Sequence, residues 1–331
     1  MQPMLASASY DATIRFWDLN RGSFISQMAH KDSQVNAMEF SADGMLLALG
    51  CWHNLKLVDM QKQTVVDSTE GNRKLRVERN VTSLFFIPES TKLITGGEDQ
   101  MIRLWNSRGS QLQCEKIAEL PYAVNSVCMG SNSNVVFATD GRGSAHQWDV
   151  RTNYLAPLPV HNLHFGEHIL SIAASGNLVA GSTNHGRILI WDAVYGNAEV
   201  KAEGLNDAWE GPVKKSQKVE IQAHPSYATR VRFTPNGERL ASTGADGSVR
   251  LWDPHNLENL DPVARFVDDS QQNPVGWVWD CAFTSSHHSK YMYSASADGL
   301  LRCWEVETAR VKMYFRGHNK PITAMTFRDS R

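Results

Sequence analysis

The chain has 331 residues, 42% of them hydrophobic, with 33 basic and 35 acidic side chains and a net charge of −2. The apolar content is sufficient for a buried core and argues against a disordered chain, and the near-neutral charge argues against nucleic acid as a partner. Because no stretch approaches about 18 consecutive apolar residues and the first ten residues carry no basic charge, we expect neither membrane insertion nor a signal peptide. The five cysteines form no C-x-x-C pair, so we expect reduced thiols and a cytoplasmic protein.

A hairpin pattern recurs along the chain. It is first found at Leu5–Asp18, where two short apolar strands flank a polar turn and the second strand ends in Trp-Asp. It returns at Leu93–Asn106, Leu240–Asp253 and Tyr293–Glu305, and in all four copies an Asp lies six residues before the Trp. One such hairpin cannot bury both of its apolar faces, so the repetition predicts a repeat architecture.

The ends of the second strands indicate the number of repeats. Seven such ends follow one another, one of them degenerate because Val replaces Trp: Trp17-Asp18, Val58-Asp59, Trp105-Asn106, Trp148-Asp149, Trp191-Asp192, Trp252-Asp253 and Trp304-Glu305. The steps between them run from 41 to 61 residues, and a period of about 40 to 45 residues with this signature is typical of four-stranded propeller blades. The chain therefore resembles the WD-repeat family over nearly its full length, which implies an all-β, seven-bladed propeller.

Each blade of that family also has an inner strand. Seven candidates are present: Val35–Phe40, Val81–Phe86, Val124–Met129, Ile169–Ala174, Ala228–Phe233, Val278–Phe283 and Ile322–Phe327. The chain would begin inside a blade and end with a lone inner strand. We therefore expect residues 1–331 to form one monomeric propeller, closed by pairing of the two termini, in which a C-terminal strand at about 321–328 completes the blade begun by residues 4–30.

Blades of this family often carry a buried polar network. The Trp indole donates to a Ser or Thr hydroxyl, the hydroxyl pairs with a His, and the His donates to the turn Asp. The resemblance implies two complete structural networks, one of His224, Ser242, Asp246 and Trp252 and one across the chain ends of His318, Ser7, Asp11 and Trp17. The blades that end at Trp105 and Trp304 lack the His, and His30 in blade two has neither the Asp nor the Trp.

Three residue sets suggest other kinds of site. The Ser, His and Asp sets resemble a hydrolase triad, but the Ser recurs within strands and not on a strained G-x-S-x-G turn. His161, His164 and His168 suggest a metal site, although no Cys lies near them. Gly141–Ser144 lacks the Lys and the helix of a phosphate loop. We therefore expect no enzyme activity, no metal and no cofactor.

Trp277 and Trp279, in GWVWDCAF, do not fit the repeat. The pattern puts Val278 in the packed layer with Cys281 and Phe283 and leaves Trp279 on the other side. Other inner strands have a small polar residue at that place: Asn36, Thr82, Asn125, Thr229 or Thr323. Trp279 either closes the mouth of the central channel or anchors a partner, since interfaces concentrate binding energy in Trp, Tyr and Arg. Trp52, at a turn site that usually holds Asp, and Tyr10 would extend the same surface.

Four stretches narrow the resemblance. They resemble the G-protein-beta-subunit-like proteins of the target-of-rapamycin kinase complexes, and they read KDSQVNAMEF, LQCEKI, GWVWDCAF and RGHNKPITAMTF. The resemblance implies a non-catalytic subunit that binds the kinase domain and stabilises its active conformation in nutrient and growth signalling. It implies contacts from Gln34, Asn36, Trp277 and Trp279, further partners among the complex subunits, and peripheral association with endomembranes through the complex.

Two other classes of WD-repeat protein were compared with these features. A heterotrimeric G-protein β subunit would need an N-terminal coiled-coil helix, whereas this chain starts directly in a strand. A substrate receptor of a cullin-type ubiquitin ligase, or another WD-repeat adaptor, is the alternative, because Trp148–Arg151 matches the W-D-x-R pattern of such receptors. Asn197–Lys218, in the longest step between repeats, is expected to form a loop at the outer edge of blade five.

Overall fold

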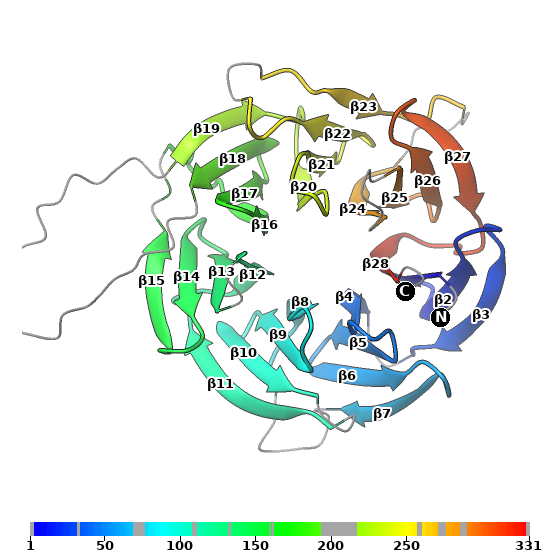
Figure 1. The fold of residues 1–331 in the computed structure, drawn as a ribbon, viewed down its shortest axis with the longest axis horizontal. Helices are drawn as coiled ribbons and strands as arrows, with labels where there is room; N and C mark the ends of the chain where they lie inside the picture. The colour runs from blue at the N-terminus through cyan, green and yellow to red at the C-terminus, as the bar shows by residue number, and fades with distance from the viewer. Residues whose placement is uncertain are drawn as a thin grey trace, which may run out of the picture.

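The strands stand in seven sheets around a common axis. The computed structural model describes residues 3–31, 34–68, 77–107, 111–131, 134–158, 160, 162–192, 217–256, 260–270, 276–284 and 290–328. Within these ranges every regular element is a β-strand, and no helix suited to crossing a membrane is found. The strands form seven four-stranded sheets, which Figure 1 shows arranged as blades in a ring. The all-β, seven-bladed propeller expected from the repeats is thus confirmed.

In each blade four antiparallel strands follow one another from the axis outward. Blade one contains β28 (Ile322–Arg328), β1 (Met4–Ser9), β2 (Thr13–Asp18) and β3 (Phe24–Ala29). Blades two and three contain β4 (Val35–Phe40), β5 (Leu46–Cys51), β6 (Asn54–Asp59) and β7 (Thr64–Ser68), then β8 (Val81–Phe86), β9 (Lys92–Gly97), β10 (Met101–Asn106) and β11 (Gln113–Glu119). Blade four contains β12 (Val124–Met129), β13 (Val135–Asp140), β14 (Ala145–Asp149) and β15 (Tyr154–Leu158).

The remaining three blades have the same order. Blade five contains β16 (Ile169–Ser175), β17 (Leu178–Thr183), β18 (Arg187–Asp192) and β19 (Gln217–Gln222). Blade six contains β20 (Ala228–Phe233), β21 (Leu240–Gly244), β22 (Val249–Trp252) and β23 (Ala264–Phe266), and blade seven contains β24 (Val278–Phe283), β25 (Tyr291–Ser296), β26 (Leu301–Glu305) and β27 (Arg310–Phe315). Most of the expected loop at 197–218 lies outside the described residues, but Gln217 and Lys218 belong to β19.

Both ends of the chain contribute to blade one. The C-terminal strand β28 pairs antiparallel with β1 from Met4 opposite Arg328 to Ala8 opposite Ala324. Figure 1 accordingly shows the N- and C-termini together at this blade. The pairing leaves β28 as the inner strand of a complete blade, so neither β1 nor the ring has an open edge at this point.

The hydrophobic core is divided into layers between neighbouring blades. The six Trp residues of the Trp-Asp ends are at most 2% exposed, and each packs against the preceding blade, as Trp105 of blade three packs with Leu55 and Leu57 of blade two. Val58 takes the same place in blade two and packs in the layer shared with blade one. Because every layer needs two blades, no blade buries its apolar faces alone.

A β-bulge recurs at the second residue of every inner strand. The pairing with the neighbouring strand skips this residue, from Val35 to Ala37 in blade two and from Val278 to Asp280 in blade seven. The bulge explains why Val278 shares a cluster with Cys281 and Phe283 despite their spacing, which strict alternation would not allow. It also re-aims the side chain of the skipped residue.

In five blades the skipped residue forms what we call the inter-blade belt. Its side chain donates a hydrogen bond to the carbonyl oxygen of the first residue of the next inner strand: Asn36 to Val81 (3.2 Å), Thr82 to Val124 (2.6 Å), Asn125 to Ile169 (2.8 Å), Thr229 to Val278, and Thr323 to Val35 (2.7 Å). The belt is interrupted where Leu170 and Trp279 occupy the position.

Deletion of residues 321–331 tests the closure of the ring. Without β28, β1 and the inner end of blade one become open edges, and His318 loses the strand that follows it. We therefore expect a single unfolding transition at a clearly lower melting temperature, and no separate fraying of one end. Deletion of residues 329–331, beyond β28, is the control and should leave the melt unchanged. Equal melting of both truncated chains and the full chain would contradict closure by the termini.

Candidate functional site

One end of the propeller combines two kinds of segment, and we call it the upper face. It contains the residues that lead into the inner strands and the turns between the second and third strands of each blade. In six blades a backbone hydrogen bond joins the two: Tyr10 to Pro321, Glu98 to Asn80, Gly141 to Ala123, Asn184 to His168, Ala245 to Tyr227 and Ala297 to Trp277. These bonds hold the loops of the upper face rigidly on the blades beneath them.

Exposed aromatic side chains gather on the upper face. Of nine exposed aromatic residues in the described part of the chain, seven lie there: Tyr10, Trp52, Tyr122, Phe165, Tyr227, Trp277 and Trp279. The other two, Phe24 and Tyr154, lie on outer strands. Aromatic residues concentrated on one face are typical of a protein–protein interface.

Three of these rings form a continuous aromatic cluster. Tyr227 packs on Trp277 and Trp277 packs on Trp279, each with 5.1 Å between ring centroids. Their exposed fractions are 41%, 38% and 37%, so the rings are partly buried on one another and still present a face to solvent. Trp279 occupies the bulge position, which aims it away from the packed layer. Tyr227 was not predicted, although it precedes its inner strand by one residue just as Trp277 does.

Gln34 and Asn36 lie at the start of β4 on the same face. The Gln34 amide donates to Asn36, and Asn36 in turn donates to Asn80 and to the Val81 carbonyl. Asn36 is therefore part of the inter-blade belt, whereas Gln34 is exposed. Within the described residues this pair has no hydrogen bond or ring contact with Trp277 and Trp279. Trp52, 54% exposed, packs edge-on against His53.

Both four-residue networks are hydrogen bonded in the order that the resemblance implies. In blade six Trp252 Nε1 donates to Ser242 Oγ (3.0 Å), which contacts His224 Nε2 (2.9 Å), while His224 Nδ1 lies 3.0 Å from Asp246. The network across the chain ends repeats this arrangement, with 2.9 Å from Trp17 to Ser7, 2.8 Å from Ser7 to His318 and 2.8 Å from His318 to Asp11. Ser7 and Ser242 are fully buried, so neither hydroxyl can meet a substrate.

Blades three and seven use an arginine where the histidine is missing. Trp105 and Trp304 still donate to Thr95 and Ser294, each at 2.8 Å. The turn carboxylates are instead held by an Arg four residues later, Arg103 on Asp99 at 2.7 Å and Arg302 on Asp298 at 2.6 Å. These pairs were not predicted, although the D-x-x-x-R spacing is visible in four repeats, at Asp11, Asp99, Asp246 and Asp298.

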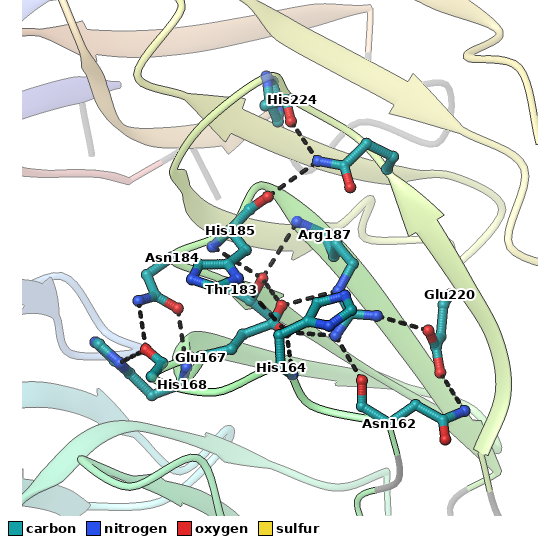
Figure 2. A network of polar contacts seen from close by, with 12 residues as sticks. Asn162, His164, Glu167, His168, Thr183, Asn184, His185, Arg187, Glu220 and His224 are labelled. Carbon is teal, nitrogen blue, oxygen red and sulfur yellow. Dashed lines mark hydrogen bonds and ion pairs between the residues drawn. The ribbon is translucent and has the colours of Figure 1, made fainter.

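Blade five carries a buried ion pair beneath the upper face (Figure 2). Glu167 accepts hydrogen bonds from Arg187, from the Thr183 hydroxyl at 2.6 Å and from the His164 backbone at 2.9 Å. Burial alone would raise the pKa of Glu167, but these bonds outweigh burial and lower it to about 2. The pair fixes the loop whose tip presents Phe165 fully to solvent.

The two described histidines of the predicted cluster, His164 and His168, are not arranged around a common metal position. His161 lies outside the described residues. His164 stacks on His185 with ring centroids 6.1 Å apart, and the His168 ring lies 3.3 Å from the Gly166 carbonyl oxygen. In the described part of the chain no group of three His, Cys, Asp or Glu side chains is arranged to hold a metal ion.

Comparison with known families agrees with the blade geometry. The model of the WD domain, G-beta repeat, matches residues 2–18, 71–106, 215–253 and 270–305. The matched stretches are WD repeats, and they lie in a seven-bladed propeller. The matched stretches contain the Trp-Asp ends of blades one, three, six and seven, whereas the structure forms seven blades.

Similar proteins come from animals and fungi. The chain is 29% identical to the target of rapamycin complex subunit LST8 of Rattus norvegicus, over 99% of this chain and 95% of the rat protein. It is 28% identical to the protein LST8 homolog of Drosophila melanogaster, over 99% and 97%. It is 29% identical to the target of rapamycin complex subunit LST8 of Saccharomyces cerevisiae, over 76% of this chain and 77% of the yeast protein.

Replacement of Asp246 by Ala tests the structural role of the networks. The change leaves the buried His224 without its acceptor and removes a partner of Ser248 and Arg250, so we expect a loss of about 1–3 kcal/mol. Arg142, at the matching turn of blade four, only stacks on Tyr122 at 4.3 Å, so Arg142→Ala should cost far less. Urea unfolding of both variants measures the two values, and equal losses would show that the network has no special role.

The Glu167–Arg187 pair predicts a dependence of stability on pH. The folded pKa of about 2 lies below the ordinary value of 4.5, so the stabilisation is complete above about pH 5 and is lost as the pH falls towards 2. Glu167→Gln should lower the free energy of unfolding by about 3 kcal/mol at neutral pH. Between about pH 5 and 3 the free energy of unfolding of this variant should fall less than that of wild type. Glu220→Gln removes the more exposed partner of Arg187 and is the matched control, with a loss of about 0–1 kcal/mol. Urea unfolding across this pH range distinguishes the variants; parallel curves for wild type and Glu167→Gln would contradict the assignment.

Proposed function

We propose that this propeller is a non-catalytic subunit of a target-of-rapamycin kinase complex, and that it binds the kinase domain and stabilises its active conformation. The names of the three similar proteins support membership of the complex, since two are target of rapamycin complex subunits and one is an LST8 homolog. The proposal includes action in the cytoplasm, with other complex subunits as further partners.

The observation that carries the proposal is the aromatic cluster of Tyr227, Trp277 and Trp279. A subunit that steadies another protein needs a rigid surface with a few strong contacts. The cluster supplies three large rings that are already packed on one another, so little side-chain entropy is lost when a partner covers them. Gln34 at the start of β4 supplies an exposed amide on the same face.

The alternative function, a ubiquitin-ligase substrate receptor, depends on a different surface. Arg151 of the W-D-x-R pattern is exposed in the turn between β14 and β15. Since β14 begins at an upper-face turn, this turn lies at the opposite end of blade four. Lys116 donates to the carbonyl oxygens of Val150 and Arg151, at 2.6 and 3.0 Å, which fixes the backbone of that turn. The two functions can therefore be tested separately.

Replacement of Trp277 and Trp279 by Ala tests the proposed interface. The double variant should bind the target-of-rapamycin kinase more weakly by roughly 2–4 kcal/mol, since the rings would be central anchors. It should remain folded, because both rings already face solvent over more than a third of their surface. Co-precipitation with the kinase, normalised to a thermal melt of each variant, gives the measurement.

Two matched variants complete that experiment. Tyr154→Ala removes a more exposed aromatic ring from an outer strand and should leave binding intact. Arg151→Ala should also leave it intact. Full binding by the double Trp variant would show that the kinase uses another face. Loss of binding by Arg151→Ala alone would favour the ligase-receptor function.

A further inference from the structure

The central channel of the propeller contains a charged cavity. The cavity has a volume of about 370 Å³ and lies between the inner strands β4, β8, β12, β16, β20 and β24. Its lining is mostly small, apolar or backbone groups, but four charged side chains from three blades face it: Glu39, Arg230, Arg232 and Asp280. A volume of this size is in the range that holds a small ligand.

The two arginines share a single carboxylate. Arg230 donates through Nε and Nη2 to the two oxygens of Asp280, at 3.1 and 3.3 Å, and Arg232 does the same at 3.2 and 3.4 Å. Asp280 is 2% exposed, whereas Arg230 is 20% and Arg232 41% exposed. Asp280 is thus enclosed by the arginines, which themselves border the cavity.

This arrangement leaves positive charge and hydrogen-bond donors unused. Two guanidinium groups and one carboxylate sum to one positive charge. Each arginine uses the same two nitrogens on Asp280, and among the described residues neither Nη1 group has an acceptor. Each Nη1 carries two N–H donors, and guanidinium groups bind phosphate oxygens with good geometry. The free donors and the excess charge therefore favour an anion in the cavity.

Glu39 is the fourth charged group, on β4 across the axis from β20 (Figure 1). Burial is the largest effect on its pKa and raises it to about 7, and the negative charge of Asp280 acts in the same direction. Arg232, the Phe86 backbone and Arg230 lower the pKa, but they do not outweigh burial. These are the charged groups that face Glu39, and the lining contributed by β8, β12 and β16 adds no other. At neutral pH Glu39 is therefore divided between its two forms.

We propose that the central channel is a binding site for a small phosphate-bearing anion, held between Arg230 and Arg232 and opposed by the carboxylate of Glu39. The anion would accept hydrogen bonds from the two Nη1 groups and neutralise the charge that Asp280 leaves unbalanced. Protonation of Glu39 would remove the opposing charge, so the site takes up the anion more readily at lower pH. This site does not depend on the proposed function.

The site is connected to the aromatic cluster through the chain. Asp280 follows Trp279 directly in β24, and Arg230 lies three residues after Tyr227. The four hydrogen bonds to Asp280 cross from β20 to β24, and the cluster lies at the start of these two strands. An anion that bridges the arginines would reinforce this junction between the two blades.

Calorimetric titration of the full chain with inorganic pyrophosphate at neutral pH tests the site. Wild type should bind, and Arg232→Gln should weaken binding about tenfold or more because it removes one of the two charged donors of the site. Arg239→Gln is the matched control: its side chain is also 41% exposed and paired with one aspartate, Asp253, but it does not line the cavity. Arg239→Gln should bind as wild type does. If Arg232→Gln does not fold, Arg232→Lys, which retains the charge but not the fork, should still weaken binding.

Titration with sulfate tests the role of Glu39 separately, because the charge of sulfate does not change between about pH 6 and about pH 8. Wild type should bind sulfate several-fold more tightly at the lower pH, where Glu39 is protonated. Glu39→Gln should bind it equally at both, with the affinity of wild type at the lower pH. Absence of pyrophosphate binding to folded wild type, or equal weakening by Arg232→Gln and Arg239→Gln, would overturn the site. A pH dependence that persists in Glu39→Gln would overturn the role of Glu39.

Discussion

A propeller is stable only if every blade is joined to the next, and the joint between the last blade and the first must be made by distant parts of the chain. Here β28 supplies that joint by pairing with β1 over the full length of the strand. The inter-blade belt adds a second connection close to the axis, in which a side chain of one inner strand caps the first carbonyl of the next. Thr323 of β28 makes this bond to Val35, so the closing strand is joined to blade two by the same kind of contact that joins other inner strands.

The belt depends on a local irregularity that is repeated with the fold. Strict alternation would point the second residue of each inner strand into the layer between blades, where an Asn or Thr would be buried without a partner. The bulge rotates that residue out of the ladder and aims it at the neighbouring strand. The first residue of the strand, such as Val81 or Val124, then packs in the core while its carbonyl accepts the belt bond. The one extra residue in each inner strand thus allows the first residue to pack in the core and the second residue to find a hydrogen-bond partner.

The fold could be predicted from the sequence because its signals are local and repeated. The hairpins, the Trp-Asp ends and the His–Asp networks lie at fixed spacings, and Trp17, Ser7 and His318 matched a pattern seen complete in blade six. The belt could not be predicted, since its acceptors are backbone carbonyls of another strand and leave no mark in the sequence. The cluster of Arg230, Arg232 and Asp280 was missed for a related reason: Asp280 lies about 50 residues from the two arginines and meets them only across two blades. Tyr227 was missed because a single Tyr before a strand is ordinary until Trp277 and Trp279 are seen to pack against it.

Trp279 occupies a position that has a structural role in other blades, but here it contributes to the exposed upper face. At its place five blades have a side chain that joins two blades, and a Trp there forgoes that hydrogen bond at the joint between blades seven and one. Positions where a sequence departs from its own local pattern without a gain in stability are expected at functional sites. In place of the hydrogen bond, the upper face has an exposed aromatic ring in a fixed position. The bulge and Trp277 hold this ring, and the two arginines bind its strand to the neighbouring strand. Leu170 departs from the belt in the same way, next to the loop that the Glu167–Arg187 pair holds and that exposes Phe165. The two interruptions of the belt therefore coincide with the two most prominent aromatic features of the upper face.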